Sequence, residues 1–282
     1  MIALAVVVPA HDEESTIGDA VRTILTAEAE IGVTVVANGC TDATADAARS
    51  AHPRVEVIEI DTASKIGALN ALQPPTDTPV AYVDADVTVS GATLLELTRR
   101  LHASPAGLVA APRLIVVPSD SWWVRQYYRV WALTDYRTTG HIGSGIYLLM
   151  PEGRSRFGEF PDVIADDLFV QRLFADHERL TPADLTFAVR APGSLRALSR
   201  RAVRIAAGNL QLADEYPELA PPRPAPGARA LVKRVARHPD LWVGFAVYSA
   251  VYAQARVRAN AHRHSRRPIG WNRDDTTRTG RR

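Results

Sequence analysis

Residues 80–86 read Val-Ala-Tyr-Val-Asp-Ala-Asp, an apolar run that ends in two acidic residues. A short apolar run of this kind predicts a buried strand, and alternate side chains of an extended chain point the same way. We therefore expect Asp84 and Asp86 to face one pocket. Two carboxylates held close together favour a cation or a proton between them, and Mg²⁺ and Mn²⁺ prefer oxygen ligands. The pair predicts a divalent metal site, with a solvated strand end as the alternative.

Strand and helix signals alternate through the sequence before this run. Apolar, β-branched segments predict strands at residues 3–9, 33–37 and 54–60. Between them, helical spacing predicts helices at residues 14–29 (with Ser15 as a candidate cap), 42–50 and 65–72. Alternation of this kind indicates an α/β fold with a mainly parallel, doubly wound sheet.

Polar residues follow each of the four predicted strands. They are His11-Asp12-Glu13, Asn38-Gly39, residues 61–65 and Asp84-Ala85-Asp86. Ligands of open α/β sheets bind outside the carboxyl ends of the strands, which is where these residues fall. The pattern alone therefore predicts a functional site at this edge of the sheet.

The remainder of the sequence predicts further helices at residues 91–102, 165–175, 195–213 and 241–255, and strands at 108–117 and 140–150. Residues 217–227 hold five prolines and one glycine, which is typical of a linker or a mobile loop. We expect a main domain over residues 1–216, a Pro-rich linker over 217–227 and a basic helical extension over 228–282.

Composition narrows the class of protein. The chain has 282 residues, which is enough for one large α/β domain with an extension. Its single cysteine, Cys40, excludes an intramolecular disulfide framework and a Cys-rich metal site, and it favours a reducing cytoplasm. No basic residues precede the apolar start, so a signal peptide is not expected, and no run reaches the ~18 apolar residues of a membrane span. We expect a cytoplasmic protein, and a location at the inner face of the membrane is left open.

Charge is distributed unevenly along the chain. Residues 1–222 carry 19 Lys and Arg against 28 Asp and Glu, a net charge of −9, whereas residues 223–282 carry 14 against 3, a net charge of +11. A basic tail on an acidic body suggests an anionic partner, with a solvated tail as the alternative. No nucleic-acid recognition module accompanies the charge, so nucleic acid is not an expected partner. Residues 228–260 remain candidates for packing on the chain itself, a homo-oligomer contact or a peripheral membrane contact.

A phosphatase of the haloacid-dehalogenase type is one rival interpretation of Asp84-x-Asp86-x-Thr88. The motif resembles the opening motif of that family, but the family places it on its first strand and requires a lysine further along the chain. Here two strand-helix units come first, and the only lysines are Lys65 and Lys233. The order of motifs therefore disfavours this alternative, and the glycine-rich fingerprints of dinucleotide-binding and P-loop proteins are absent from the sequence.

The sequence resembles the family-two glycosyltransferases, which have the Rossmann-like GT-A fold. Five segments match that family in its order, and the resemblance extends from residue 2 to about residue 210. They are Val6-Val7-Val8-Pro9-Ala10-His11-Asp12-Glu13, Val35-Val36-Ala37-Asn38-Gly39-Cys40-Thr41-Asp42, Lys65-Ile66-Gly67-Ala68-Leu69-Asn70, Tyr82-Val83-Asp84-Ala85-Asp86 and Ile164-Ala165-Asp166-Asp167.

The resemblance implies roles for individual residues. A nucleoside-diphosphate sugar would be bound by Pro9, Ala10, His11, Glu13, Asn38, Lys65, Asp84, Ala85, Asp86, Arg201 and Arg204. Within this set Asp86, together with Asp84, would hold Mn²⁺ or Mg²⁺. Asp167, preceded by Asp166, would be the general base that deprotonates the acceptor.

The implied activity is inverting sugar transfer from a nucleoside-diphosphate sugar, with UDP as the expected nucleotide. The acceptor would be a lipid carrier, a saccharide or a small natural product. This sequence departs from the family pattern at four positions. Ala37 replaces an acid that the family often has, which leaves the nucleobase open, and Ile205 stands where the family has tryptophan, which weakens a link to processive polymerisation. Ser64 takes the position of a glycine, and Asp166 replaces the usual glutamate. A non-catalytic sugar-nucleotide-binding relative is the alternative. We interpret Gly143-Ser144-Gly145 as a tight turn rather than a substrate contact.

Overall fold

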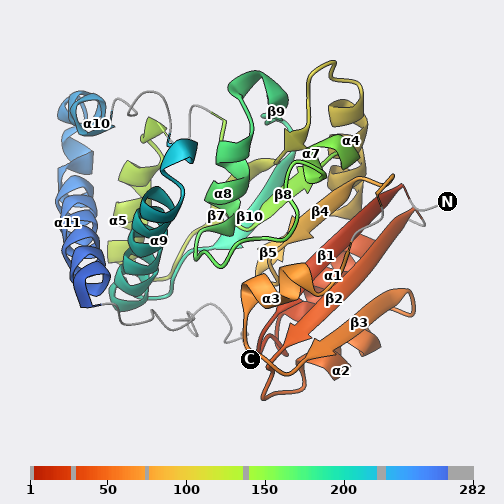
Figure 1. The fold of residues 1–282 in the computed structure, drawn as a ribbon. Coiled ribbons are helices and arrows are strands. Elements are labelled where there is room, and N and C mark those ends of the chain that lie inside the picture. The colour runs from red at the N-terminus through yellow and green to blue at the C-terminus, as the bar shows by residue number, and fades with distance from the viewer. Residues whose placement is uncertain (1–2, 27–29, 74–75, 136–139, 221–226, 266–282) are drawn as a thin grey trace. The chain divides into compact units, whose positions relative to one another are not determined.

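The computed structural model describes residues 3–26, 30–73, 76–135, 140–220 and 227–265 (Figure 1). The chain forms two compact units. The first, here called the sheet unit, comprises Met1–Val116, Ile142–Asp162 and Asp166–Val189. The second, called the helical unit, comprises Val117–His141, Val163–Ala165 and Arg190–Arg282. The boundaries predicted at residues 216 and 228 stay a prediction, and part of the predicted linker lies outside the described residues.

A seven-stranded sheet is the centre of the described part of the sheet unit. Its order is β3 (Val55–Ile60), β2 (Ile31–Asn38), β1 (Leu4–Ala10), β4 (Val80–Val83), β8 (Ile146–Leu149), β6 (Val109–Ala110) and β9 (Arg179–Leu180). The four strands from β3 to β4 are parallel, whereas β8 runs antiparallel to both β4 and β6. This confirms the predicted α/β fold with a mainly parallel sheet.

Helices cover this sheet and complete its core. α1 (Ile17–Leu25) contacts α2 (Thr44–Ala51) and α4 (Gly91–His102), and it buries Ile17, Val21 and Ile24. Ser15 is not the helix cap, because α1 begins after Thr16. The Thr16 hydroxyl is 2.7 Å from Oε2 of Glu13, to which it donates.

One predicted strand differs from the structure for a clear physical reason. The strand expected at 108–117 is divided into β6 and β7 (Arg113–Val117) around Pro112, which has no N–H to donate to a ladder. β7 instead joins a three-stranded sheet with β5 (Val87–Thr88) and β10 (Thr186–Arg190). Within the segment 140–150, the predicted turn is present, since Gly143, Ser144 and Gly145 all have positive φ angles, and the strand that follows it is β8.

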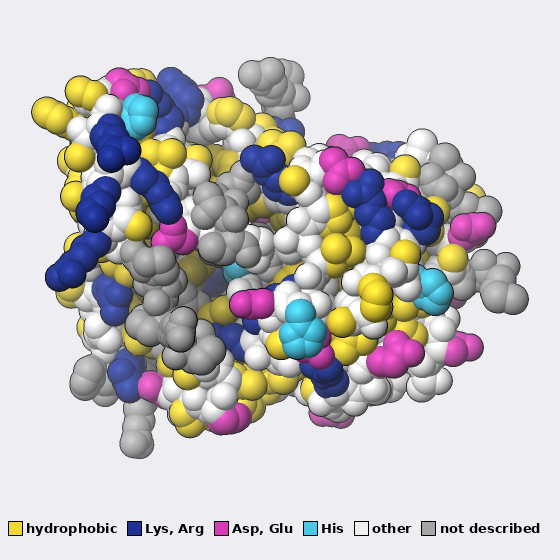
Figure 2. All heavy atoms as spheres, turned by 90° about the horizontal axis from the view of Figure 1, so that it is seen from above, with side chains coloured by type: hydrophobic (Ala, Val, Ile, Leu, Met, Phe, Trp, Pro, Cys, Tyr) yellow, Lys and Arg dark blue, Asp and Glu magenta, His cyan; other side chains and the backbone are white. Residues whose placement is uncertain are grey.

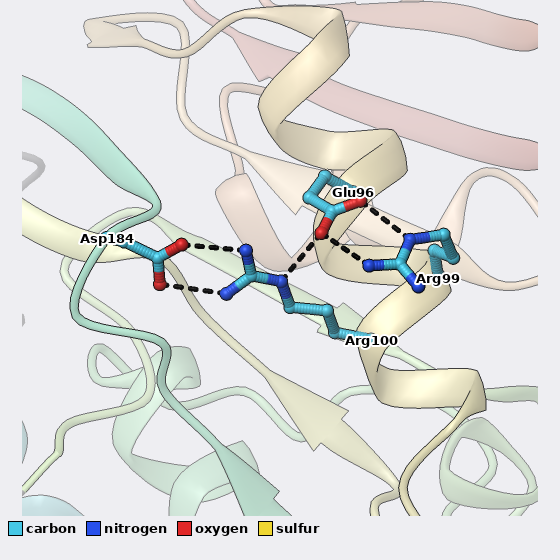
Figure 3. A network of polar contacts seen from close by, with 4 residues as sticks. All are labelled: Glu96, Arg99, Arg100 and Asp184. Atoms are coloured by element: carbon cyan, nitrogen blue, oxygen red, sulfur yellow. Dashed lines mark hydrogen bonds and ion pairs between the residues drawn. The ribbon is translucent and has the colours of Figure 1, made fainter.

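Arg100 ties α4 to the segment before β10 (Figure 3). Its guanidinium donates to both carboxylate oxygens of Asp184, at 2.8 and 2.7 Å, and its Nε donates to Glu96 at 2.7 Å. Arg99 donates twice to the same Glu96 carboxylate. The network thus links a helix with the segment that leads into β10, the middle strand of the second sheet.

The helical unit contains α5 (Trp122–Trp131), α9 (Leu195–Glu215), α10 (Gly227–Ala236) and α11 (Trp242–Ser265), with short helical turns at Pro217–Leu219 and Pro239–Leu241. α11 packs along α9 and α5, and its predicted span of 241–255 extends by a further ten residues to Ser265. Val130, Leu231, Val235 and Leu241 form a buried cluster in this unit. None of the helices in the described residues has the length and apolar character needed to cross a membrane.

Two further helices of the sheet unit follow β8. α7 (Pro151–Arg154) is a single turn, and α8 (Asp166–Leu173) begins with the two adjacent aspartates that the sequence singled out. α3 (Lys65–Asn70) follows β3 and begins with the lysine of the predicted site. The structure therefore places these three charged residues at helix starts.

Candidate active site

Lys65 joins two acidic motifs that lie far apart in the sequence. Its Nζ lies 2.8 Å from Oδ1 of Asp84 and 2.9 Å from Oδ1 of Asp166. Asp84 follows β4 and Asp166 is the first residue of α8. The predicted metal motif and the predicted base motif therefore meet at one ammonium group.

The position of Lys65 is determined by both ends of its short helix. At the start of α3, the Ser64 hydroxyl accepts a hydrogen bond from the Gly67 N–H at 2.9 Å and caps the first turn. At the other end, the Asn70 amide donates to the Phe160 carbonyl at 2.9 Å and accepts from the Phe160 N–H at 2.8 Å. These contacts fix α3 against the segment that leads to α8.

The charges of this cluster are strongly coupled. Burial by itself would lower the pKa of Lys65, but the carboxylates of Asp166, Asp84 and Asp167 outweigh it and raise that pKa above its usual value. Burial raises the pKa of Asp84 to about 6, against the opposing effect of Lys65. Lys65 is therefore a fixed positive charge in a cluster where carboxylates outnumber it.

Tyr147 is a further member of the cluster. Its hydroxyl lies 3.2 Å from Oδ2 of Asp166, to which it donates, and the side chain of Asp166 is only 4% exposed. Burial and the nearby carboxylate of Asp166 raise the pKa of Tyr147 well above its usual value, so it stays a donor at neutral pH. Asp166 is consequently occupied on both oxygens, by Lys65 and by Tyr147.

Asp167 is held differently from its neighbour. Its Oδ2 accepts from the Ser144 N–H at 2.9 Å, and its Oδ1 accepts from the Leu168 N–H at 2.8 Å. Burial and the charge of Asp166 raise the pKa of Asp167, whereas Lys65 and the two N–H groups oppose that increase. Asp167 is thus an oriented carboxylate with a greater affinity for a proton than an ordinary aspartate.

The donor set around Asp84 and Asp86 suits a hard divalent cation. Asp86 is exposed, whereas Asp84 is partly buried. A Cβ added at Gly145, whose φ is +93°, would lie 3.1 Å from Oδ2 of Asp84, so the glycine keeps the space beside that oxygen open. Carboxylate oxygens next to an open space fit Mg²⁺ or Mn²⁺.

The predicted nucleoside loops after β1 and β2 are joined through Asn38. This fully buried side chain donates to the Ala10 carbonyl at 2.8 Å and accepts from the Ser64 N–H at 3.1 Å. The ring Nδ1 of His11 lies 2.6 Å from the Asn38 carbonyl oxygen. Asn38 therefore connects the ends of both strands with the start of α3.

Other residues predicted for the nucleoside pocket are largely buried. Pro9 and Ala10 are buried at the end of β1. Glu13 is 7% exposed; its carboxylate accepts from Thr16, and its N–H donates to Thr44 at 2.7 Å. Ala85 is buried between the two aspartates of the metal motif. Their contact with a nucleotide stays a prediction.

His11, Asp12 and Cys40 have ligand-type atoms within 4.8 Å of one another, which is close enough for a cation. Asp12 already accepts from the Thr41 N–H at 2.5 Å and from its hydroxyl at 3.1 Å. The Cys40 thiol lies 3.6 Å from the Ala10 carbonyl oxygen. These contacts join the two loops, and we assign the cluster to that structural role.

Arg201 and Arg204 lie on α9 in the helical unit, and both are partly buried. The sheet unit contains every other residue of the predicted site. The contact of these two arginines with a diphosphate stays a prediction.

Gly143, Ser144 and Tyr147 belong to the cluster, yet the sequence does not predict them as site residues. Ser144 has a φ of 65°, a conformation that few residues other than glycine adopt and that often marks functional segments. The turn predicted here exists, and it also holds Asp167. The sequence signal for this part of the site is a single residue flanked by two glycines, directly before a buried strand.

A mainly parallel sheet with an acidic cluster at the carboxyl ends of its strands is typical of an α/β enzyme. The model of the family "Glycosyl transferase family 2" matches residues 5–151, which is more than half of the chain. The chain belongs to glycosyl transferase family 2. Asp166 and Asp167 lie beyond the matched residues, whereas Lys65, Asp84 and Asp86 lie within them.

Solved structures share the fold. The mannosyltransferase PcManGT from Pyrobaculum calidifontis, solved with GDP-Man and Mn²⁺, is 22% identical with a TM-score of 0.59, over 93% of this chain and 79% of that one. Glucosyl-3-phosphoglycerate synthase from Mycobacterium tuberculosis, solved with Mn²⁺ and UDP-glucose, is 17% identical with a TM-score of 0.55, over 74% and 78%. No curated protein sequence matches this chain. These structures establish the GT-A fold predicted from the motifs.

Proposed function

We propose that this protein is an inverting glycosyltransferase that moves a sugar from a nucleoside-diphosphate sugar, with UDP as the expected nucleotide, to an acceptor hydroxyl. The observation that carries the proposal is the position of Lys65 between Asp84 and Asp166. It brings the motif proposed to hold the metal together with the motif proposed to hold the base. Family membership also favours transfer over the phosphatase alternative.

Asp167 is the residue we propose as general base. Its two oxygens accept backbone hydrogen bonds from Ser144 and Leu168, which orient the carboxylate while leaving it ionisable. Asp166 is more deeply buried and is already bound by Lys65 and Tyr147. One base that removes the acceptor proton, with no protein nucleophile, gives a single displacement and inversion.

Asp86 and Asp84 are the residues we propose as metal ligands. A divalent cation bound there would stabilise the charge that develops on the departing nucleoside diphosphate. Lys65 already pairs with Asp84, so it stands close to the same charge and is suited to contact the diphosphate or the ribose. The exposed position of Asp86 leaves its carboxylate accessible to a cation.

The proposal leaves the acceptor class open among lipid carriers, saccharides and small molecules. Two nucleobases need to be compared first. The structurally similar mannosyltransferase was solved with GDP-mannose and the synthase with UDP-glucose. Ala37 lies buried near the end of β2, at the position where the family resemblance implies an acid.

A thermal-shift panel tests the proposal with UDP, GDP, dTDP and CDP and their sugars, each with Mn²⁺, Mg²⁺ or EDTA. A ligand that binds only the native state raises the unfolding midpoint by mass action. We expect a metal-dependent shift with one nucleotide, which Asp86→Ala removes. Asp77→Ala, which truncates an exposed aspartate just before β4, is the matched control and should retain the shift.

Two outcomes would count against transfer. A folded protein that shows no shift with any nucleotide would contradict donor binding. A shift without release of nucleoside diphosphate across a panel of lipid, saccharide and small-molecule acceptors would favour a non-catalytic sugar-nucleotide-binding relative.

A further inference from the structure

α11 has apolar residues on two opposite faces. One face, with Gly244, Val251, Ala255 and Ala259, is buried as the helix packs along α9 and α5. The other face consists of residues at alternating intervals of three and four, which align along one side of a helix. They are Val243, Ala246, Ala250, Ala253 and Val257, and all five are exposed.

This second face contains no charged side chain, and large apolar groups extend it. Val243 is 51% exposed, Val257 is 68% exposed, and Trp242 at the start of the helix is 59% exposed. A surface helix normally turns polar residues toward water, so an apolar stripe of this length indicates a partner. Among the described residues, α11 therefore has a second apolar face that is exposed, in addition to the one that packs within the unit.

An apolar groove continues this face toward α5. It has a volume of about 520 Å³, and Trp123 of α5 and Leu195 of α9 line it together with Ala246 and Ala250 of α11. Trp123 is 51% exposed and packs edge-on against Trp122, which is 45% exposed. Tryptophan prefers the boundary between water and lipid, where its ring is buried and its N–H stays hydrated.

The described part of the helical unit is rich in basic residues. The described residues of the helical unit include 14 Lys and Arg and 6 Asp and Glu, and α11 itself has no acidic residue. Three of the six acids, Asp135, Asp214 and Asp240, already pair with arginines of the same unit. Figure 2 shows Lys and Arg side chains interleaved with apolar ones over the part of the molecule that carries α10.

The charge pattern selects the partner. A second copy of α11 would offer no acidic residue to Arg256 and Arg258, which are exposed on this helix, because 242–265 contains no Asp or Glu. Phospholipid phosphates would instead complement these arginines while the apolar stripe enters the acyl boundary. We infer that the outer face of α11, with the groove that Trp123 lines, docks the protein on an anionic membrane surface.

Vesicle flotation with the full-length chain tests this inference. Vesicles of phosphatidylcholine with about 30% phosphatidylglycerol should bind the protein, and pure phosphatidylcholine or about 0.5 M salt should weaken binding at least tenfold. Ala250→Glu and Val257→Glu each place a charge in the apolar stripe and should weaken binding at least about tenfold. Ala92→Glu, the same change at an exposed alanine of α4, is the matched control and should bind normally.

The test also separates the stripe from the other basic parts of the chain. Both glutamate variants retain every arginine of the chain. A difference in vesicle binding between these variants and the control therefore cannot come from the basic residues after 265. Arg256→Gln with Arg258→Gln should reduce the preference for anionic lipid. Failure of the unaltered chain to bind anionic vesicles, or equal binding by all variants, would overturn the inference. A second result would also overturn the inference: light scattering that shows the unaltered chain as a dimer, which Ala250→Glu dissociates, together with no binding of that chain to vesicles.

Discussion

Gly143 and Asp167 approach each other so closely that no side chain fits between them. A Cβ at Gly143 would lie 2.7 Å from the Cβ of Asp167 and 2.9 Å from its Oδ2. The φ of Gly143 is +116°, which residues with a side chain rarely adopt. This contact sets the turn whose next N–H, from Ser144, holds the same carboxylate.

Gly143→Ala should displace Asp167 from its present position. Because a misplacement of about 1 Å can reduce a rate about a hundredfold, we expect kcat to fall by about 10- to 100-fold while nucleotide binding changes little. Steady-state kinetics and the thermal shift by the donor nucleotide measure the two effects separately. Gly158→Ala, at a glycine with nothing within 4 Å of an added Cβ, is the matched control. Equal turnover by both variants would show that the turn does not position the base.

Asp167→Asn and Asp166→Asn form a matched pair that identifies the base. The first should retain donor binding and slow transfer by about 10²- to 10⁴-fold, as expected for a lost general base. The second should have a smaller effect, because Asp166 is nearly fully buried and its two oxygens are already bound by Lys65 and Tyr147. Single-turnover rates with saturating donor measure both. A larger loss with Asp166→Asn would assign the base to that residue instead.

The pH dependence of transfer should report the raised pKa of Asp167. A base acts when deprotonated, so the rate falls as pH falls through its pKa, and burial together with Asp166 places that pKa above the usual carboxyl value. Asp166→Asn removes one of the charges that raise it. We therefore expect the acid limb of the kcat profile to move to lower pH in that variant. A limb that stays in place would mean that another group titrates.

Lys65→Met should reduce stability as well as donor binding, because it leaves the carboxylates of Asp84 and Asp166 without their shared cation. Asp166 is almost fully buried, so its unpaired charge should lower the free energy of unfolding by about 3–5 kcal/mol. Urea unfolding at neutral pH measures this. Lys233→Met changes the only other lysine, which is exposed on α10, and should leave the midpoint unchanged. Equal midpoints would contradict the structural role of the bridge.

The sequence predicts the first half of the sheet well because each signal there is local. Buried parallel strands are continuous apolar runs, so the run before Asp84 identifies β4 over residues 80–83 without reference to the rest of the chain. The same locality predicts that Lys65, Asp84 and Asp166 are polar residues near strand or helix ends. That Asp84 and Asp166 both meet the ammonium group of Lys65 depends on the sheet order, in which β4 lies between β1 and β8.

Other features depend on contacts that no local pattern contains. The importance of Ser144 comes from its N–H, which the identity of its side chain does not reveal. The outer face of α11 is apolar like its buried face, so the packing against α9 and α5 is needed to distinguish them. β10 was not predicted because its partners, β5 and β7, are distant in sequence.

The network around Arg100 gives a prediction about stability and pH. Arg100→Gln should lower the thermal midpoint more than Arg99→Gln, because Arg100 joins α4 to Asp184 whereas Arg99 pairs only within its helix.

The hydrogen bonds from Arg99 and Arg100 lower the pKa of Glu96 to about 2. A carboxyl whose pKa is lowered by folding stabilises the fold above its unfolded pKa of about 4.3, and that contribution disappears as pH falls toward the folded value. The difference between wild type and Arg100→Gln should therefore be largest at neutral pH and low salt, and it should shrink as the pH falls below about 4 or as salt screens these exposed charges. Melting curves from pH 7 to pH 3 measure this, and a difference that grows toward low pH would contradict the ion-pair origin.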